Sequence, residues 1–527
     1  MTPVIYDFRF VRVHSHYSLV KGGFNLKSEI RNQKFVLALD IGTSSLRAML
    51  FDSQAHVVPG VEAQVKYEMR TTPDGGAEFD ADEILGYAER TIDETLAKAG
   101  DRASQIVGVA SDSLVSNILG VDETGRAVTP VFTYADTQCA REVSELRALF
   151  DERVAQQRVG TLFHTSYLPA RFLWLEREYP ELLKRARYWM SLGEYFLFRW
   201  TRFAQRACSY SVASWTGLLN RQQLTWDSEL LSALPITVDQ LSSLVDHDES
   251  VGTLCAEYAN RWSALRNAKW FPTVGDGAAA NIGSGCIDSS RIALTVGTSS
   301  AMRVVTPTPT LPRIAGEGEI PWGLWSYRVN RDTELIGGAL SEGGSLFKWM
   351  IETLNLGQGV EKELATLEPD AHGLTMLPFL AGERAPNWNA DARGAIIGLH
   401  LNTRPIDIVR AGLESVAYRL GLIFELLHSA VPKANQVVAS GGALINSPAW
   451  TQIITDTLGV PVIVSAESEA TSRGAALLAL KALGEISSLA DLPAQTGVVF
   501  TPDALRHRIY AHARERQKSL YNAVVGN

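Results

Sequence analysis

Cysteine is scarce in this sequence: four residues in 527, at Cys139, Cys208, Cys255 and Cys286. They are scattered and form no Cys-x-x-Cys pair, which argues against a disulfide framework or a structural zinc site. No apolar run reaches the length of about 18 residues that a membrane-spanning helix needs. We therefore expect reduced thiols, no membrane association and a cytoplasmic protein.

An excess of basic residues is also missing, since the formal net charge is −9. This balance argues against a partner such as nucleic acid, which requires a basic face. A single phosphate group can still be held, because a few backbone N–H groups suffice to bind it. Neither a Gly-x-x-x-x-Gly-Lys-Ser/Thr loop nor a Gly-x-Gly-x-x-Gly turn after a strand occurs, which excludes P-loop enzymes and disfavours dinucleotide-binding dehydrogenases.

The length of the chain predicts more than one domain, because single cores rarely exceed about 250–300 residues. Residues 1–34 carry six Lys or Arg against two acids and lack the apolar centre of a secretory signal. We predict a disordered extension over residues 1–34, domains over 35–287 and 288–515, and a tail over 516–527.

A repeated tetrapeptide, Gly-Thr-Ser-Ser, is the main feature of the sequence. It occurs at residues 42–45 and 297–300, each time after a buried apolar run (35–39 and 292–296) and before another (46–51 and 301–305). Two similar strand-turn-strand units indicate an internal duplication. Elsewhere strand patterns alternate with helix patterns, as at 80–100, 106–110 and 437–458, which predicts an α/β fold.

Closely spaced N–H and hydroxyl groups in such turns can bind phosphate oxygens. The expected ligands are Thr43, Ser44 and Ser45 in the first turn and Gly297 and Thr298 in the second. Asp40 precedes the first turn and would repel a phosphate unless a cation such as Mg²⁺ lay between them. Thr295 takes that place in the second turn, so only one copy would hold metal. A single turn of this kind could equally be an ordinary hairpin.

Two further segments carry glycine beside polar groups. Gly441 and Gly442 follow a strand and precede a helix, where a flat ligand such as adenosine can approach the backbone, although many strand-helix turns contain two glycines. Asp276 lies between Gly275 and Gly277 and could accept a proton from an attacking hydroxyl group, or it could belong to a plain turn. We interpret residues 380–388 as a solvated connector, and the following aromatic residues as core or interface: Trp322, Trp325, Trp349 and Tyr418.

These motifs, in this order from about residue 35 to 515, resemble the FGGY carbohydrate kinases, which have two duplicated actin-like (ribonuclease H-like) ATPase domains with a cleft between them. The resemblance implies ATP and Mg²⁺ as cofactors, with Asp276 as catalytic base. It assigns Asn446 to the adenosine site with Gly441 and Gly442, and Gly338 to the nucleotide side. It implies a small sugar or sugar acid as partner, and we keep a homodimer as an open expectation.

Within the family the chain looks most like gluconate kinases, with xylulose kinases next, on the segments 209–214, 336–344 and 381–386. The expected substrate residues are Ser116, Tyr134, Asp136 and Asp276. Relatives often carry Met-His where this chain has Val115 and Ser116, and an Arg where it has Gln138. The sugar side has therefore departed from the family pattern, which leaves three alternatives: a kinase of another ketose or polyol, a non-catalytic sugar-sensing relative, or an actin-like ATPase acting on protein partners.

Overall fold

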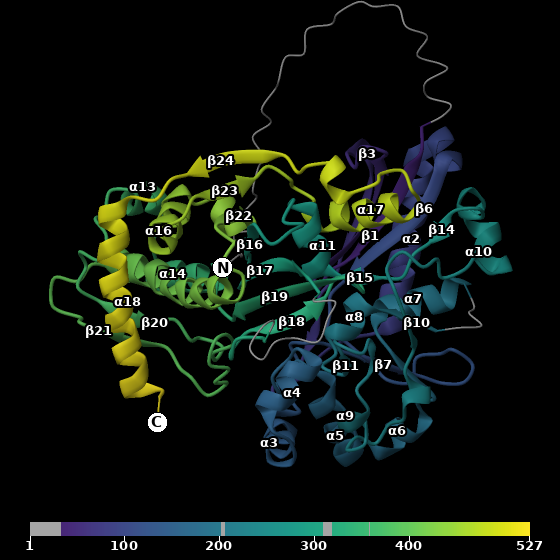
Figure 1. Ribbon diagram of the computed structural model, residues 1–527, viewed down its shortest axis with the longest axis horizontal. Helices are drawn as coiled ribbons and strands as arrows, with labels where there is room; N and C mark the ends of the chain where they lie inside the picture. Colours follow the sequence, from purple (N-terminus) through teal and green to yellow (C-terminus); the bar gives the residue numbers. More distant parts are fainter. Residues whose placement is uncertain (1–32, 202–205, 309–318, 358, 527) are drawn as a thin grey trace, which may run out of the picture. The chain divides into compact units, whose positions relative to one another are not determined.

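Two β-sheets of the same topology form the core of the protein (Figure 1). They are seen in a computed structural model, which describes residues 33–201, 206–308, 319–357 and 359–526. The predicted extension over 1–34 lies almost wholly outside the described residues. Residues 34–527 form one unit.

The first sheet has the strand order β14-β6-β1-β2-β3, with β15 also paired to β6. Its strands are β1 (Phe35–Ile41), β2 (Ser45–Asp52), β3 (Val57–Lys66), β6 (Ile106–Ser113), β14 (Lys269–Trp270) and β15 (Val274–Gly275). β1 is buried on both faces, as its continuous apolar run predicts. Leu37 and Leu39 enter one core, whereas Val36 and Ala38 enter another, because successive side chains of a strand point to opposite faces.

The second sheet has the order β18-β19-β17-β16-β22-β23-β24. Its strands are β16 (Arg291–Val296), β17 (Ser300–Pro307), β18 (Trp325–Arg328), β19 (Thr333–Leu340), β22 (Gln436–Ser440), β23 (Val462–Ser465) and β24 (Thr496–Phe500).

Both sheets share one plan. β1 is antiparallel to β2 and parallel to β6, and β16 is antiparallel to β17 and parallel to β22. Each Gly-Thr-Ser-Ser segment is the tight connection of the antiparallel pair. The predicted duplication and the α/β fold class are therefore confirmed.

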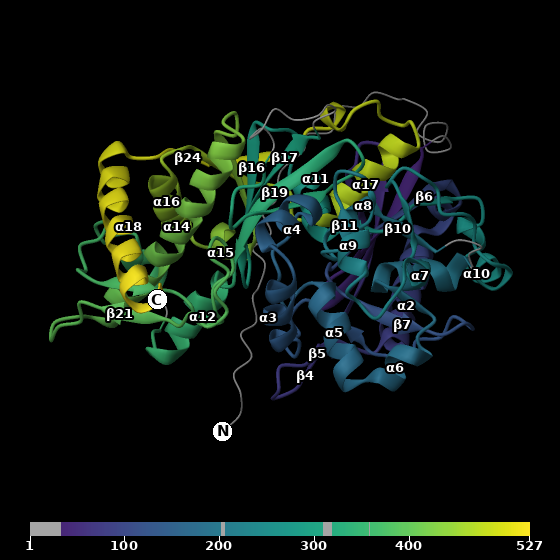
Figure 2. The ribbon, with the colours of Figure 1, turned by 60° about the horizontal axis from the view of Figure 1, so that its bottom comes forward.

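Helices cover both sheets. On the first sheet, α2 (Ala81–Ala99) begins after Asp80, whose side chain accepts a hydrogen bond from the N–H of Glu83, as the sequence predicts. The opposite face carries α17 (Ala470–Ala482), which packs on β1, β6 and α11 (Asp276–Gly283) (Figures 1 and 2). A helix from beyond residue 287 thus completes the core of the first sheet, so a single cut at 287 does not separate the two cores.

The second sheet is covered by α14 (Pro405–Ala430) and α16 (Pro448–Leu458), and α18 (Ala504–Val524) packs outside them (Figure 2). The predicted tail over 516–527 is wrong as a separate segment. α18 runs through it to Val524, and the buried Gln517 donates hydrogen bonds to the carbonyl oxygens of Met376 and Ser415.

The remaining elements are short. The helices are α3 (Ala140–Leu149), α4 (Glu152–Val159), α5 (Leu168–Glu178), α6 (Pro180–Arg185), α7 (Leu192–Thr201), α8 (Tyr210–Ser214), α9 (Ser228–Leu231), α10 (Ala256–Arg261), α12 (Gly344–Thr353), α13 (Val360–Leu364) and α15 (Gly442–Ile445). The strands are β4 (Arg70–Thr71), β5 (Ala77–Phe79), β7 (Leu119–Val121), β8 (Val131–Phe132), β9 (Tyr188–Met190), β10 (Ala207–Ser209), β11 (Leu219–Asn220), β12 (Thr225–Trp226), β13 (Ser243–Val245), β20 (Thr375–Leu377) and β21 (Ala395–Ile397).

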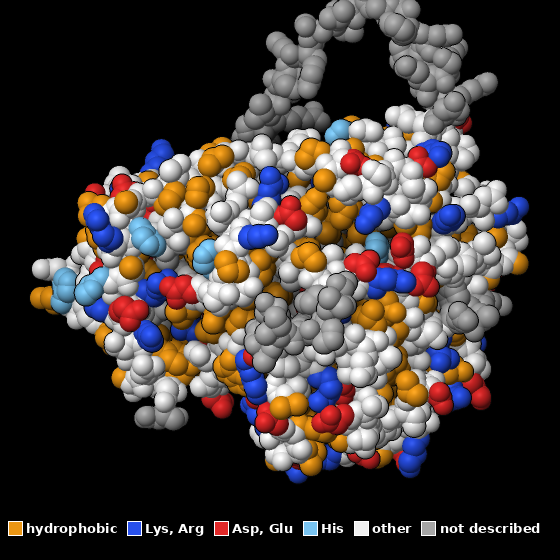
Figure 3. All heavy atoms as spheres, in the orientation of Figure 1, with side chains coloured by type: hydrophobic (Ala, Val, Ile, Leu, Met, Phe, Trp, Pro, Cys, Tyr) orange, Lys and Arg blue, Asp and Glu red, His pale blue; other side chains and the backbone are white. Residues whose placement is uncertain are grey.

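The surface carries charges of both signs. On the face drawn in Figure 3, Lys and Arg side chains alternate with Asp and Glu over the described residues. Among the helices that the structure describes, none combines the length and the apolar character needed to cross a bilayer. All four cysteines are free thiols.

Candidate active site

Both Gly-Thr-Ser-Ser turns contribute to one cavity of about 330 Å³. Gly42, Thr43 and Ser44 line it from the first sheet, and Ser299 and Ala301 line it from the second. Asp276 lies in the same wall. The structure therefore brings the first turn together with the second turn and the predicted base, both of which follow it by more than 200 residues in sequence.

Each turn is held by a different neighbour. In the first, the N–H of Gly42 donates to the carbonyl of Ser45 (3.0 Å), and the N–H of Tyr67 donates to the carbonyl of Ser44 (3.1 Å). In the second, the N–H of Gly344 donates to the carbonyl of Gly297 (2.7 Å), and the hydroxyl of Ser345 donates to the carbonyl of Thr298 (2.7 Å). The carbonyl oxygens of Ser44, Ser45, Gly297 and Thr298 thus accept hydrogen bonds, whereas the side chains of Ser44, Thr298 and Ser299 remain exposed.

The strand register of the first sheet brings three carboxyl groups close together. Asp40 near the end of β1 is paired with Asp112 near the end of β6, and Asp112 is paired with Val274 of β15, two residues before Asp276. Paired residues of adjacent strands share a face of the sheet, so the side chains of Asp40 and Asp112 lie on the same side. Asp276 begins α11 directly after β15, and its charge acts on Asp112. Burial, followed by the charges of Asp40 and Asp276, raises the pKa of Asp112 well above its usual value. No sequence motif surrounds Asp112, so it was not predicted as a site residue.

Asp276 is the first residue of α11, and its Oδ1 accepts a hydrogen bond from the N–H of Gly277 (2.7 Å). Burial raises the pKa of this carboxyl to about 6, although the positive charge of Arg303 opposes the rise. The flanking glycines have a packing role: a Cβ at Gly275 would lie 2.8 Å from Val115 Cγ1, and one at Gly277 would lie 2.9 Å from Trp215 Cζ2. Glycine here lets Trp215 lie directly against the base.

The predicted sugar residues divide into two groups. Ser116 and Tyr134 line the cavity. Ser116 is held at a φ of 53°, an uncommon conformation for a non-glycine residue, and its hydroxyl donates to the carbonyl of Trp215 (2.7 Å).

Asp136, in contrast, is buried away from the cavity lining. Its Oδ1 forms an ion pair with Nη1 of Arg171 (2.5 Å), and its Oδ2 accepts a hydrogen bond from the N–H of Ala77 (3.2 Å). Gln138, where relatives carry Arg, donates instead to Asp74 (2.8 Å). The contacts of Asp136 give it a structural role, and its contact with substrate stays a prediction.

Several cavity residues were not predicted. Trp215 stacks on Tyr327 with ring centroids 3.6 Å apart, and Trp325, expected to be only a core residue, lines the cavity beside them. Arg303 from β17 and Arg384 from the loop over 380–388 also line it. The Nε atom of each of these arginines is buried without a hydrogen-bond partner. This loop is therefore part of the cavity wall and is not merely a solvated connector.

The predicted nucleotide residues surround the end of β22. Gly441 has a φ of 97°, and Asn446 donates from Nδ2 to the carbonyl of Gly442 (2.7 Å). Gly442 and Asn446 are exposed, as a ligand contact requires. Gly338 lies within β19, where a Cβ would meet Ala385 at 2.9 Å, so packing alone explains this glycine. Its nucleotide contact stays a prediction.

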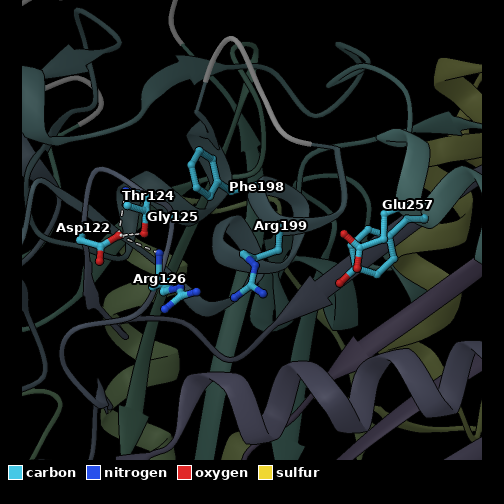
Figure 4. A pocket seen from close by; sticks show the side chains of 8 residues that line it. Asp122, Thr124, Gly125, Arg126, Phe198, Arg199 and Glu257 are labelled. Carbon is cyan, nitrogen blue, oxygen red and sulfur yellow. Dashed lines mark hydrogen bonds between the residues drawn. The ribbon is translucent and has the colours of Figure 1, made fainter.

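A larger hollow, of about 820 Å³, lies elsewhere on the protein (Figure 4). Two acidic residues, Asp122 and Glu257, line it. Asp122 is bound within its own turn, because its Oδ1 accepts hydrogen bonds from the N–H groups of Thr124 (2.8 Å) and Arg126 (3.0 Å). Arg199 pairs with Asp82 (2.9 Å). This hollow combines no base with a phosphate-binding turn, so the smaller cavity is the candidate active site.

Comparison with known proteins agrees with this geometry. Gluconokinase from Bacillus subtilis is 28% identical over 467 residues, which cover 86% of this chain and 88% of that protein. The crystal structure of gluconate kinase from Lactobacillus acidophilus superposes with a TM-score of 0.85 at 26% identity, covering 93% of this chain and 98% of that one. Ligand-bound xylulose kinase from Lactobacillus acidophilus gives the same TM-score, identity and coverage.

Two family matches span most of the sequence. Residues 35–283 match the N-terminal domain of the FGGY family of carbohydrate kinases, and residues 292–483 match its C-terminal domain. Kinases of this family use ATP. The chain belongs to the FGGY family of carbohydrate kinases.

Proposed function

We propose that the protein transfers the γ-phosphoryl group of ATP to a hydroxyl group of a sugar acid, with D-gluconate, yielding 6-phosphogluconate, as the best candidate. The observation that carries the proposal is the position of Asp276. This half-buried carboxyl, with a pKa of about 6, lines the same cavity as Thr43 and Ser44 of the first turn and Ser299 of the second. A general base works best when its pKa lies near the operating pH.

In the proposed reaction, Asp276 accepts the proton of the acceptor hydroxyl group. The hydroxyl oxygen then forms a bond to the γ-phosphorus, the bond from that phosphorus to the β–γ bridging oxygen breaks, and ADP leaves. Thr43, Ser44 and Ser45 of the first turn and Gly297 and Thr298 of the second would bind phosphate oxygens. Such catalysis depends mainly on positioning and on stabilisation of charge.

Asp40 is the residue we propose to hold Mg²⁺. Its carboxyl lies at the end of β1 beside the first turn, and Asp112 next to it supplies two buried oxygens that lack any other hydrogen-bond partner. Buried carboxylate oxygens of this kind suit a hard divalent cation. When bound, Mg²⁺ supplies positive charge that offsets the charge of the phosphate oxygens.

The arginines favour an acidic acceptor. Arg303 and Arg384 line the cavity together with Asp276, and the charge of Arg384 acts on Arg303 as well as on Tyr134. A long acceptor with its reacting hydroxyl at Asp276 could thus place its carboxylate at Arg384, since guanidinium groups bind carboxylates through paired N–H donors. A neutral ketose such as xylulose is the second candidate, because a xylulose kinase structure matches as well as a gluconate kinase structure.

The test is an ADP-release assay with gluconate, xylulose, ribulose and glycerol, and with no sugar. We expect the highest kcat/KM with gluconate and a single phosphorylated product. A higher kcat/KM with xylulose would show that the substrate assignment is wrong and that the assignment as an ATP-dependent sugar kinase is right. Sugar binding by calorimetry without ADP release would favour a sensing protein, and ATP hydrolysis that ignores sugar would favour an ATPase acting on other partners.

A further inference from the structure

Asp112, the carboxyl group next to the proposed metal ligand Asp40, has as yet no role of its own. It lies on β6 between the strand that carries Asp40 and the strand that leads to Asp276. Its side chain has no exposed surface. Apart from the facing carboxyl of Asp40, neither oxygen of Asp112 has a hydrogen-bond partner among the residues that the structure describes.

Such an arrangement needs an explanation, because a buried carboxyl without partners is costly. The nearby cations have other partners: Arg47 pairs with Glu469 (2.6 Å), although its charge also acts on Asp40, and Arg303 lies beside Asp276. Two facing carboxylates repel each other unless a proton or a cation lies between them. An apolar residue would fill this position of β6 without an unpartnered polar group, as Val109 and Ala110 do elsewhere in the strand. Packing alone therefore does not explain an aspartate here.

We infer that Asp112 is a second protein carboxylate of the magnesium site and holds the ion together with Asp40. The inference rests on the proposed function for the identity of the site, but it concerns metal binding alone. Mg²⁺ takes oxygen ligands and is commonly bound by one or two carboxylates together with waters and substrate phosphates. The first Gly-Thr-Ser-Ser turn follows Asp40 by one residue, so an ion between Asp40 and Asp112 lies next to the predicted phosphate site.

Asp112 is thus a positioning residue that acts through the metal, with no contact to the acceptor. The pair of residues beside each Gly-Thr-Ser-Ser turn also differs between the two sheets. In the second sheet Thr295 is paired with Ser440, and the two hydroxyl groups lie 3.2 Å apart, where the first sheet pairs Asp40 with Asp112. One repeat therefore offers two carboxylates for a cation, and the other offers two neutral hydroxyl groups.

The experiment measures Mn²⁺ binding by electron paramagnetic resonance, with and without ADP, in the full-length protein and three variants. We expect Asp112→Asn to weaken Mn²⁺ binding about ten- to a hundredfold, as loss of a supporting metal-site carboxylate does. Asp40→Asn should weaken it at least as much. Asp101→Asn, at an exposed acid, is the matched control and should bind like the wild type. Asp112→Ser replaces Asp112→Asn if the latter fails to fold, as judged by circular dichroism.

Unchanged Mn²⁺ affinity in Asp112→Asn, with reduced affinity in Asp40→Asn, would overturn the inference and make Asp112 a proton-sharing neighbour of Asp40. Absence of Mn²⁺ binding in the wild type would also overturn it. If Asp112→Asn loses Mn²⁺ affinity while no sugar is phosphorylated by the wild type, the proposed function fails and the inference stands.

Discussion

Replacement of Asp276 by Asn should lower the activity of the protein and raise its stability. The folded pKa of about 6 lies above the ordinary value of 3.8, so the folded state holds this proton more tightly than the unfolded chain. The resulting stabilisation is complete below pH 3.8 and is lost as pH rises through 6. At pH 7 the ionised carboxylate then costs up to about 3 kcal/mol, at 1.36 kcal/mol per pKa unit. Asp276→Asn removes this cost and should raise the thermal midpoint.

The same substitution should lower kcat at least about a hundredfold, the usual contribution of a general base. In the wild type, a pKa of about 6 leaves the base largely ionised at pH 7 and largely protonated at pH 5. We therefore expect kcat/KM to fall about tenfold between these pH values. The assays are ADP release from pH 5 to 8 and thermal melting, with the exposed Asp101→Asn as control.

Full activity of Asp276→Asn would refute the assignment of the base. If kcat/KM of the wild type falls only near pH 4, burial does not raise the pKa of Asp276, because the group then ionises as an exposed carboxyl does. A variant that is inactive and less stable would show that the carboxylate is needed for folding.

Three other predictions concern the cavity and its surroundings. Arg384→Met should raise KM for gluconate about tenfold or more, the value of a charge-assisted hydrogen bond, and change KM for xylulose little; equal effects on both would contradict an acidic acceptor. Asp136→Asn should break the buried pair with Arg171 and lower stability by about 3–5 kcal/mol, measured by thermal melting; a rise in KM for sugar at permissive temperature would support the predicted contact of Asp136 with substrate, and an unchanged KM would leave Asp136 a structural role alone. Gly441→Ala should weaken ADP binding by calorimetry and lower the melting temperature, since the positive φ alone costs about 1–3 kcal/mol and a Cβ would collide with the carbonyl oxygen of Val296; a variant that binds ADP normally would remove Gly441 from the nucleotide site.

The sequence pattern was informative wherever function depends on local backbone. The two Gly-Thr-Ser-Ser turns, the strands beside them and the helix begun at Asp80 follow from apolar runs, turn residues and caps, which act over a few positions. The internal duplication followed from the repeat, and the α/β fold class followed from the alternation of strand and helix patterns. The predicted boundary at 287 does not assign every helix to the correct core, because α17 packs on the first sheet. No local pattern in the sequence indicates which sheet a helix will cover.

The acceptor side could not be predicted in the same way, because its residues meet only through tertiary packing. Arg384 reaches the cavity from a loop that reads as a polar connector, and Arg171 supplies the partner of Asp136 from a separate helix. A sequence shows residue types, but it does not show which buried acid already has a cation beside it.

Asp112 illustrates the same limit from the metal side. In sequence it is one acid within a strand, with no motif around it, and only the parallel register of β1 and β6 brings it opposite Asp40. Register within a buried sheet is fixed, because a slip by one residue would turn every side chain of the strand to the other face. The pairing of the two acids is therefore as firmly determined as the core itself. Two facing carboxylates at this position repel each other and lower the stability of the folded protein. The proposed divalent cation, when bound between them, would offset this repulsion.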